Sequence, residues 1–134
     1  MQKYLLVFVT AFIFVSLFSC SKTDTTKPTA ELLSPADADT FFITDTILFR
    51  AAFSDNEELN QYRMEMKNDF TEITDSLSAW KFVVVDALSG TQDTVSRELI
   101  IPDTIYSGNY LLILKCADAD GNEAAGDTAR IVIE

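Results

Sequence analysis

The 134-residue chain contains no histidine and only two cysteines, four glycines and three prolines. Without histidine, a Ser-His-Asp or Cys-His catalytic arrangement is impossible, and a zinc site made of the usual histidine and cysteine ligands is excluded. Paired carboxylates are the remaining acid–base option. The adjacent Glu57 and Glu58 lie in a predicted surface turn, where neighbouring residues rarely form such a pair. The composition therefore predicts a protein that is not an enzyme and has no cofactor other than a calcium ion considered below.

Positive charge is also scarce, because ten lysines and arginines stand against 21 aspartates and glutamates, which gives a net charge of −11. Binding to nucleic acid depends on neutralising phosphates with lysine and arginine, so nucleic acid is not an expected partner. The same balance argues against direct binding of the protein surface to an anionic membrane. A lipid anchor, by contrast, needs no surface charge.

The N-terminus has the layout of a secretory signal peptide. Lys3 supplies a positive charge, residues 4–18 carry none, and Ser19 is small. The uncharged run is short for a bilayer-spanning helix, which needs about 20 apolar residues, so cleavage after Ser19 is expected. The stretch LFSC at 17–20 resembles the bacterial lipobox, in which the cysteine is acylated and becomes the mature N-terminus. The resemblance implies a lipid anchor on Cys20; the alternative is an ordinary signal peptide with an incidental cysteine.

Three segments follow from this pattern. Residues 1–19 are the predicted lipoprotein signal peptide, and residues 20–28 are the lipidated cysteine with a polar, threonine-rich tether. Residues 29–134 have the length of a single domain. The expected location is the outer membrane, on its periplasmic face or at the cell surface.

The domain sequence is a series of short alternating or β-branched runs separated by Asp, Gly, Asn, Pro and Ser clusters, which is typical of an all-β sandwich. Alternation is clearest in residues 59–67, where Tyr62, Met64 and Met66 share one face. We expect an immunoglobulin-like β-sandwich of about seven antiparallel strands. The expected strands are 29–33 with a continuation at 41–43, 46–54, 59–67, 80–86, 94–101, 109–117 and 128–133.

Residues 31–70 and 107–124 resemble a group of uncharacterised lipoproteins of Bacteroidetes type, the domain of unknown function 4625 family. More loosely, the chain is similar to bacterial immunoglobulin-like domains that end in a Gly-x-Tyr strand followed by Asp-x-x-Gly-Asn. The matching residues here are Gly108, Tyr110, Asp118, Gly121 and Asn122. The resemblance implies an immunoglobulin-like fold and a cell-envelope location, and it supplies no known activity. Family members often carry histidines after the third strand, and no role of those histidines transfers to this chain.

Acidic residues recur in the loops that follow the second and sixth expected strands. In a seven-stranded sandwich these loops cluster at one end with the N-terminus. Oxygen ligands from separate loops suit Ca²⁺. The candidate calcium ligands are Asp55, Glu57, Asp118 and Asp120. The alternative is a solvated acidic rim, in which Asp118 forms a turn and Gly121 supplies a positive φ.

Apolar residues recur in the segments predicted at the opposite end, away from the membrane. The candidate contacts with a partner are Phe70, Ile73, Leu77 and Tyr106. The alternative is that these side chains pack under their own loops.

Taken together, the sequence favours a non-enzymatic lipoprotein that serves as a binding or adhesion module for a protein or a glycan. One alternative is a structural or accessory subunit of an envelope complex. Another is a calcium-dependent binding module. The fold-level part of this hypothesis is an analogy, because one fold hosts many functions.

Overall fold

The computed structural model describes residues 23–70, 77–124 and 126–134. Within these ranges the backbone forms strands, bridges and turns. The described residues accordingly contain no helix that is long and apolar enough to span a bilayer. The predicted signal peptide, the lipidation site Cys20 and the candidate contact Ile73 lie outside the described residues.

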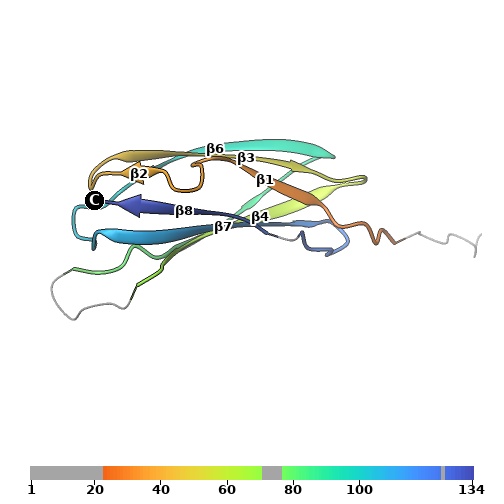
Figure 1. Ribbon diagram of the computed structural model, residues 1–134. Helices are drawn as coiled ribbons and strands as arrows, with labels where there is room; N and C mark the ends of the chain where they lie inside the picture. The colour runs from red at the N-terminus through yellow and green to blue at the C-terminus, as the bar shows by residue number, and fades with distance from the viewer. Residues whose placement is uncertain (1–22, 71–76, 125) are drawn as a thin grey trace, which may run out of the picture.

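The strands form two sheets packed face to face (Figure 1). The first sheet has the order β1-β3-β6 and consists of β1 (Thr29–Ser34), β3 (Thr46–Ser54) and β6 (Gln92–Ile100). The second sheet has the order β2-β8-β7-β4-β5 and consists of β2 (Thr40–Phe41), β8 (Asp127–Ile133), β7 (Gly108–Asp118), β4 (Leu59–Asn68) and β5 (Phe82–Ala87). The predicted all-β sandwich is confirmed.

The start of the chain differs in detail from the expected seven antiparallel strands. Phe41, the first residue of the expected continuation at 41–43, instead pairs together with Thr40 in parallel with β8 in the other sheet. Pro35 has no N–H to donate to the β1–β3 ladder, and the Asp39 carboxylate accepts the backbone N–H of Ala36 (2.8 Å) to form a turn. The chain therefore leaves the first sheet after β1, and β2 becomes a separate strand.

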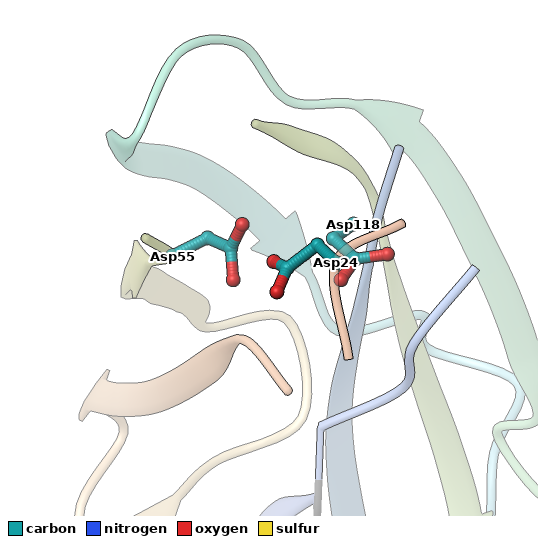
Figure 2. Close-up of side chains that lie close together, drawn as sticks. All are labelled: Asp24, Asp55 and Asp118. Carbon is teal, nitrogen blue, oxygen red and sulfur yellow. The ribbon is translucent and has the colours of Figure 1, made fainter. Parts of the chain in front are cut away.

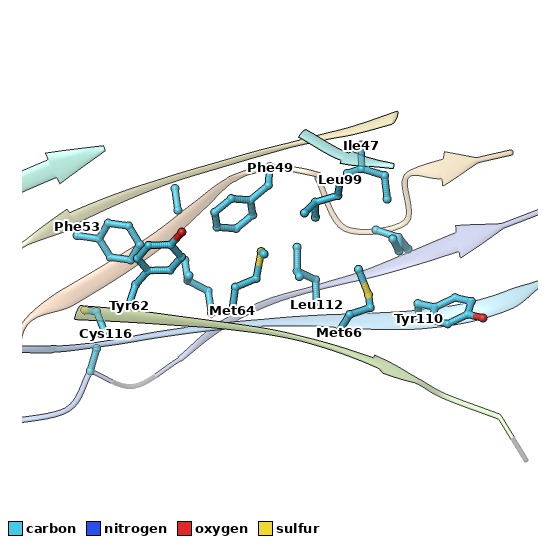
Figure 3. Packing of buried hydrophobic residues seen from close by; sticks show 14 of the residues in the cluster. Ile47, Phe49, Phe53, Tyr62, Met64, Met66, Leu99, Tyr110, Leu112 and Cys116 are labelled. Carbon is cyan, nitrogen blue, oxygen red and sulfur yellow. The ribbon is translucent and has the colours of Figure 1, made fainter. Parts of the chain in front are cut away.

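The core lies between the two sheets and is filled by the alternate residues of β3, β4 and β7 (Figure 3). Tyr62, Met64 and Met66 are each at most 1% exposed, as their alternation predicts. Burying one large apolar side chain stabilises the fold by about 1.5–3 kcal/mol relative to leaving it exposed. The opposite residues of the same strands remain on the surface, so the alternation fixes which side chains of the second sheet reach solvent.

The sandwich has two ends of different composition. The acidic end, defined as residues 23–28, 55–58 and 118–124, includes the incoming N-terminal stretch, the β3–β4 turn and the β7–β8 loop (Figure 1). The distal end, defined as residues 69–70, 77–81 and 101–107, includes the segments that precede β5 and β7. The expected clustering of the acidic loops with the N-terminus at one end is thus what the structure shows.

Candidate functional site

Three aspartates converge at the acidic end (Figure 2). Asp24 lies in the N-terminal stretch, Asp55 directly follows β3, and Asp118 is the last residue of β7. One carboxylate oxygen from each residue lies within 4.8 Å of the other two. Two oxygens that each bind one calcium ion at about 2.4 Å can be at most about 4.8 Å apart. The separation is therefore compatible with a shared ion.

The β7–β8 loop holds Asp118 in a fixed position. The backbone N–H of Asn122 donates to Oδ1 of Asp118 (2.7 Å), and the side-chain Nδ2 of Asn122 donates to Oδ2 (2.6 Å). Gly121 has a φ of +89°, which a glycine adopts without steric cost. Burial would raise the pKa of Asp118, but the hydrogen bonds from Asn122, Gly121 and Asp120 outweigh it and lower that pKa. Asp118, 1% exposed, is therefore a buried carboxylate that remains ionised.

Asp24 brings the N-terminal stretch onto this loop. Its backbone N–H donates to Oδ2 of Asp120 (2.7 Å), and its carbonyl oxygen accepts from Nδ2 of Asn122 (3.1 Å). The N–H of Thr26 donates to Oδ1 of Asp24 (2.9 Å) and lowers the pKa of that carboxyl. Pro28 is buried. The part of the predicted tether that the structure describes thus lies against the sandwich.

Two carboxylate oxygens in the cluster have no partner among the described residues. Oδ2 of Asp24 and Oδ1 of Asp55 are both shielded from solvent and accept no hydrogen bond, whereas Oδ2 of Asp55 accepts the N–H of Glu57 (3.1 Å). None of the ion pairs between described residues includes any of the three aspartates. A buried charged oxygen without a donor is costly, so a ligand that the described residues do not supply would stabilise these two atoms.

Cys116 responds to the negative potential of the cluster. Its side chain is 3% exposed, and the thiol is free. Burial first, and then the charges of Asp55 and Asp118, raise the pKa of Cys116 to about 11. The thiol is therefore protonated at neutral pH in the metal-free protein, which disfavours Cys116 as a ligand because metals bind the thiolate.

The structure brings together two of the four candidate calcium ligands, Asp55 and Asp118. Glu57 points to solvent and contributes only its backbone N–H, while Asp120 accepts the backbone N–H of Asp24. The sequence reasoning missed Asp24 because that residue falls in the stretch interpreted as a tether. The available signal was topological, since an acidic residue just before the first strand arrives at the same end as the other acidic loops.

At the distal end, the described candidate contacts pack mainly under their own loops. The Phe70 ring makes edge-on contacts with Tyr110 (centroids 5.4 Å apart) and Tyr106 (6.1 Å). The hydroxyl of Tyr110 donates to the carbonyl oxygen of Tyr106 (2.7 Å) and accepts the backbone N–H of Trp80 (3.4 Å). Leu77 is 39% exposed. The aromatic residues therefore stabilise the connection between β6 and β7.

Comparisons with known proteins agree with the fold. The model of the family described as domain of unknown function DUF4625 matches residues 18–133, and no curated protein matches the sequence. The structure is similar to the PKD domain of an M14-like peptidase from a Thermoplasmatales archaeon, with a TM-score of 0.51 and 16% identity over 80% of this chain and 92% of that one. PKD domains are immunoglobulin-like.

Two longer proteins contain a similar domain. A DUF4466 family protein from Parabacteroides merdae has a TM-score of 0.53 and 13% identity, and the match covers 81% of this chain and 46% of that protein. OgpA from Akkermansia muciniphila has a TM-score of 0.54 and 12% identity, and the match covers 85% of this chain and 31% of OgpA. The chain thus spans less than half of either protein, and at these identities the likeness shows the fold alone.

Proposed function

The chain belongs to the DUF4625 family of unknown function, and on that premise we propose that it is a non-enzymatic, immunoglobulin-like binding module whose acidic end binds a calcium ion. The observation that carries the calcium site is the convergence of Asp24, Asp55 and Asp118 around two buried, unpartnered carboxylate oxygens. The sequence pattern grouped Asp55 with Asp118 but did not include Asp24, which lies 94 positions before Asp118.

The donor set fits a hard divalent cation. Calcium accepts six to eight oxygen ligands from carboxylates, carbonyls and water in flexible geometry. Asp24, Asp55 and Asp118 would supply three carboxylates, and their combined charge of −3 exceeds the charge of the ion. With no histidine in the chain and a protonated Cys116, the nitrogen and thiolate ligands that favour softer metals are missing from the site.

A bound ion would join three segments that are distant in the sequence. The N-terminal stretch, the end of β3 and the end of β7 each contribute one aspartate. Because these residues come together only in the folded chain, the ion would bind the native state and stabilise it by mass action. It would also fix the N-terminal stretch against the β7–β8 loop.

We place a lipid anchor on Cys20, four positions before Asp24. The support for this anchor is the signal-peptide layout and the lipobox-like stretch at 17–20. With that anchor, the acidic end lies next to the membrane and the distal end points away from it. The surfaces available to a partner are then the distal end and the outer faces of the sheets.

The calcium site is tested by measuring the melting temperature of the purified protein in EDTA and in millimolar Ca²⁺. At one hundred times the dissociation constant, a bound ion contributes about 2.7 kcal/mol. For a domain of this size that raises the melting temperature by on the order of 10 °C. Asp24→Asn and Asp55→Asn are each expected to abolish the rise.

Asp45→Asn is the matched control for Asp55→Asn. Asp45 is an exposed turn aspartate whose carboxylate, like that of Asp55, accepts a backbone N–H, here that of Phe42 (2.8 Å), but it lies outside the acidic end. This variant should keep the full calcium response. A rise that is equally large in Asp55→Asn and Asp45→Asn, or no rise in the unmodified protein, would refute the site.

A further inference from the structure

The second sheet ends in an open edge at β5. Among the described residues this strand pairs only with β4, and residues 82–86 make no backbone hydrogen bond outside that ladder. Its sequence, FVVVDA, contains no proline, and its ladder shows no register shift. Proteins usually protect an edge strand with proline, charge or a bulge, because a free edge is a template for another strand. The β5 edge carries one charged residue, Asp86.

Beside this edge, the outer face of the second sheet is apolar on β5 and basic on β4 and β7. Val83 and Val85 are 48% and 51% exposed. On β4, Arg63 lies opposite Val85, and Lys67 follows two alternate positions along the same face. The β4–β7 ladder places Arg63 directly opposite Lys115. Like charges in that position are destabilising unless something compensates for them.

Arg63, Lys67 and Lys115 form a basic patch, which is unusual in a chain with a net charge of −11. The outward side chains of β4 include a single carboxylate, Glu65, which pairs with both Arg63 (3.2 Å) and Lys67 (3.1 Å). These two cations lower the pKa of Glu65, with Lys67 contributing more. One carboxylate is thus shared between two cations, and Lys115 adds a third positive charge. The patch therefore favours a ligand that brings further negative charge.

Two surface hollows lie beside these valines and cations. One is lined by Arg63, Val85 and Lys115 together with residues of β7 and the β7–β8 loop. The other is lined by Lys67, Lys81 and Val83 together with neighbouring residues of β4 and β5. Each hollow combines a β5 valine with two cations and one carboxylate, which is Glu123 in the first hollow and Glu65 in the second. The β5 valines and the cations of β4 and β7 thus lie on the same outer face of the second sheet.

We propose that the β5 edge binds an extended, acidic segment of a partner polypeptide as an added strand. Backbone hydrogen bonds to β5 would supply affinity, as in other cases of strand addition. Alternate side chains of the segment would contact Val83 and Val85. Strands lie about 4.8 Å apart, so β4 would be about 10 Å from the added strand, within reach of long arginine, lysine and glutamate side chains. This inference rests on the proposed role as a binding module and does not depend on calcium.

The test uses fluorescence anisotropy of a labelled ten-residue peptide with alternating glutamate and valine, added to the purified protein. We expect binding that is at least tenfold weaker for the matching lysine–valine peptide. Methylating alternate backbone nitrogens of the glutamate–valine peptide should also weaken binding at least tenfold, because methylation removes the N–H donors that pair with β5 while keeping the charge.

Val83→Asp should weaken binding of the glutamate–valine peptide at least tenfold, whereas Val83→Lys should preserve it. The matched control is Leu48→Asp, because Leu48 is 47% exposed on the outer face of the first sheet. That variant should bind like the unmodified protein. Circular dichroism of the variants establishes that each is folded.

Three results would overturn the proposal. In the first, neither the peptide nor polygalacturonate binds. In the second, polygalacturonate binds and the peptide does not, which assigns the basic patch to a glycan. Alternatively, the protein forms a concentration-dependent dimer that Val83→Asp dissociates, which assigns the edge to a second copy of the chain. Each of these results is compatible with a calcium-dependent melting temperature, so failure here is distinguishable from failure of the calcium site.

Discussion

The two ends of the sandwich differ in whether their side chains find partners within the described residues. At the distal end, the Phe70 ring contacts Tyr106 and Tyr110, and the Tyr110 hydroxyl both donates and accepts a hydrogen bond. At the acidic end, Asp24 and Asp55 each keep a buried oxygen that has no hydrogen-bond partner among the residues that the structure describes. Aromatic side chains gathered at one end of a sandwich suggest a binding surface, yet here they complete the fold. The unsatisfied groups therefore favour the acidic end over the distal end as a ligand-binding site.

The largest expected effect is at the distal end. Phe70→Ala should destabilise the protein by about 2–3 kcal/mol, somewhat less than a fully buried phenylalanine, because it leaves a cavity against Tyr106 and Tyr110. Urea denaturation measures this change, and the response to calcium should be unaffected. A cost below about 0.5 kcal/mol, typical of a surface substitution, would return Phe70 to the list of candidate partner contacts.

A smaller loss of stability is expected for Gly108→Ala, about 1–2 kcal/mol from backbone strain together with crowding of the Phe70 ring. Gly108 has a φ of +147°, and a Cβ there would lie 3.0 Å from Cδ1 of Phe70. The control is Gly90→Ala, at a φ of +68° with no atom within 4 Å of the added Cβ. In the Phe70→Ala background the Gly108 substitution should cost less, because the ring that it crowds is gone. Equal costs in both backgrounds would exclude the steric contact.

The acidic end predicts a pH dependence that the distal aromatic residues cannot produce. The pKa values of Asp24 and Asp118 are lower in the folded protein than the ordinary aspartate value of 3.8. Their ionised forms therefore stabilise the fold above that value, and this contribution is lost as the pH falls through the lowered pKa values. In calcium-free buffer, urea midpoints measured from pH 6 to pH 2.5 should decrease below about pH 4. The decrease should be smaller in Asp118→Asn than in the unmodified protein.

The smallest expected effect is on Cys116. Its pKa is raised to about 11 by burial and by the charges of Asp55 and Asp118. Asp55→Asn removes one of these charges, so the pKa of the thiol should fall, and saturating calcium should lower it too. Thiolate absorbance as a function of pH measures both shifts. An unchanged pKa in Asp55→Asn would mean that the charge of Asp55 does not contribute to it.

The sequence predicts most of the fold because alternation records burial directly. Tyr62, Met64 and Met66 are buried as their spacing indicates, and residues 46–54 form β3 within the expected bounds. The separate strand β2 could not be predicted, because two residues, Thr40 and Phe41, give no alternation and their partner β8 is at the other end of the chain.

The candidate site was only partly predictable for a similar reason. Sandwich topology places Asp55 and Asp118 at one end, but it does not specify which acidic side chains of a loop turn inward. Glu57 faces solvent, whereas Asp24 is held by the β7–β8 loop through Asp120 and Asn122. Those contacts join residues almost a hundred positions apart, and no local pattern contains them.

The most direct test of the calcium site is a crystal structure of the protein grown in millimolar Ca²⁺, with the ion identified by its anomalous scattering. We predict one calcium peak between Asp24, Asp55 and Asp118, with a carboxylate oxygen of each residue about 2.3–2.6 Å from the ion. No peak between the three carboxylates, or a peak elsewhere on the surface only, would contradict the account.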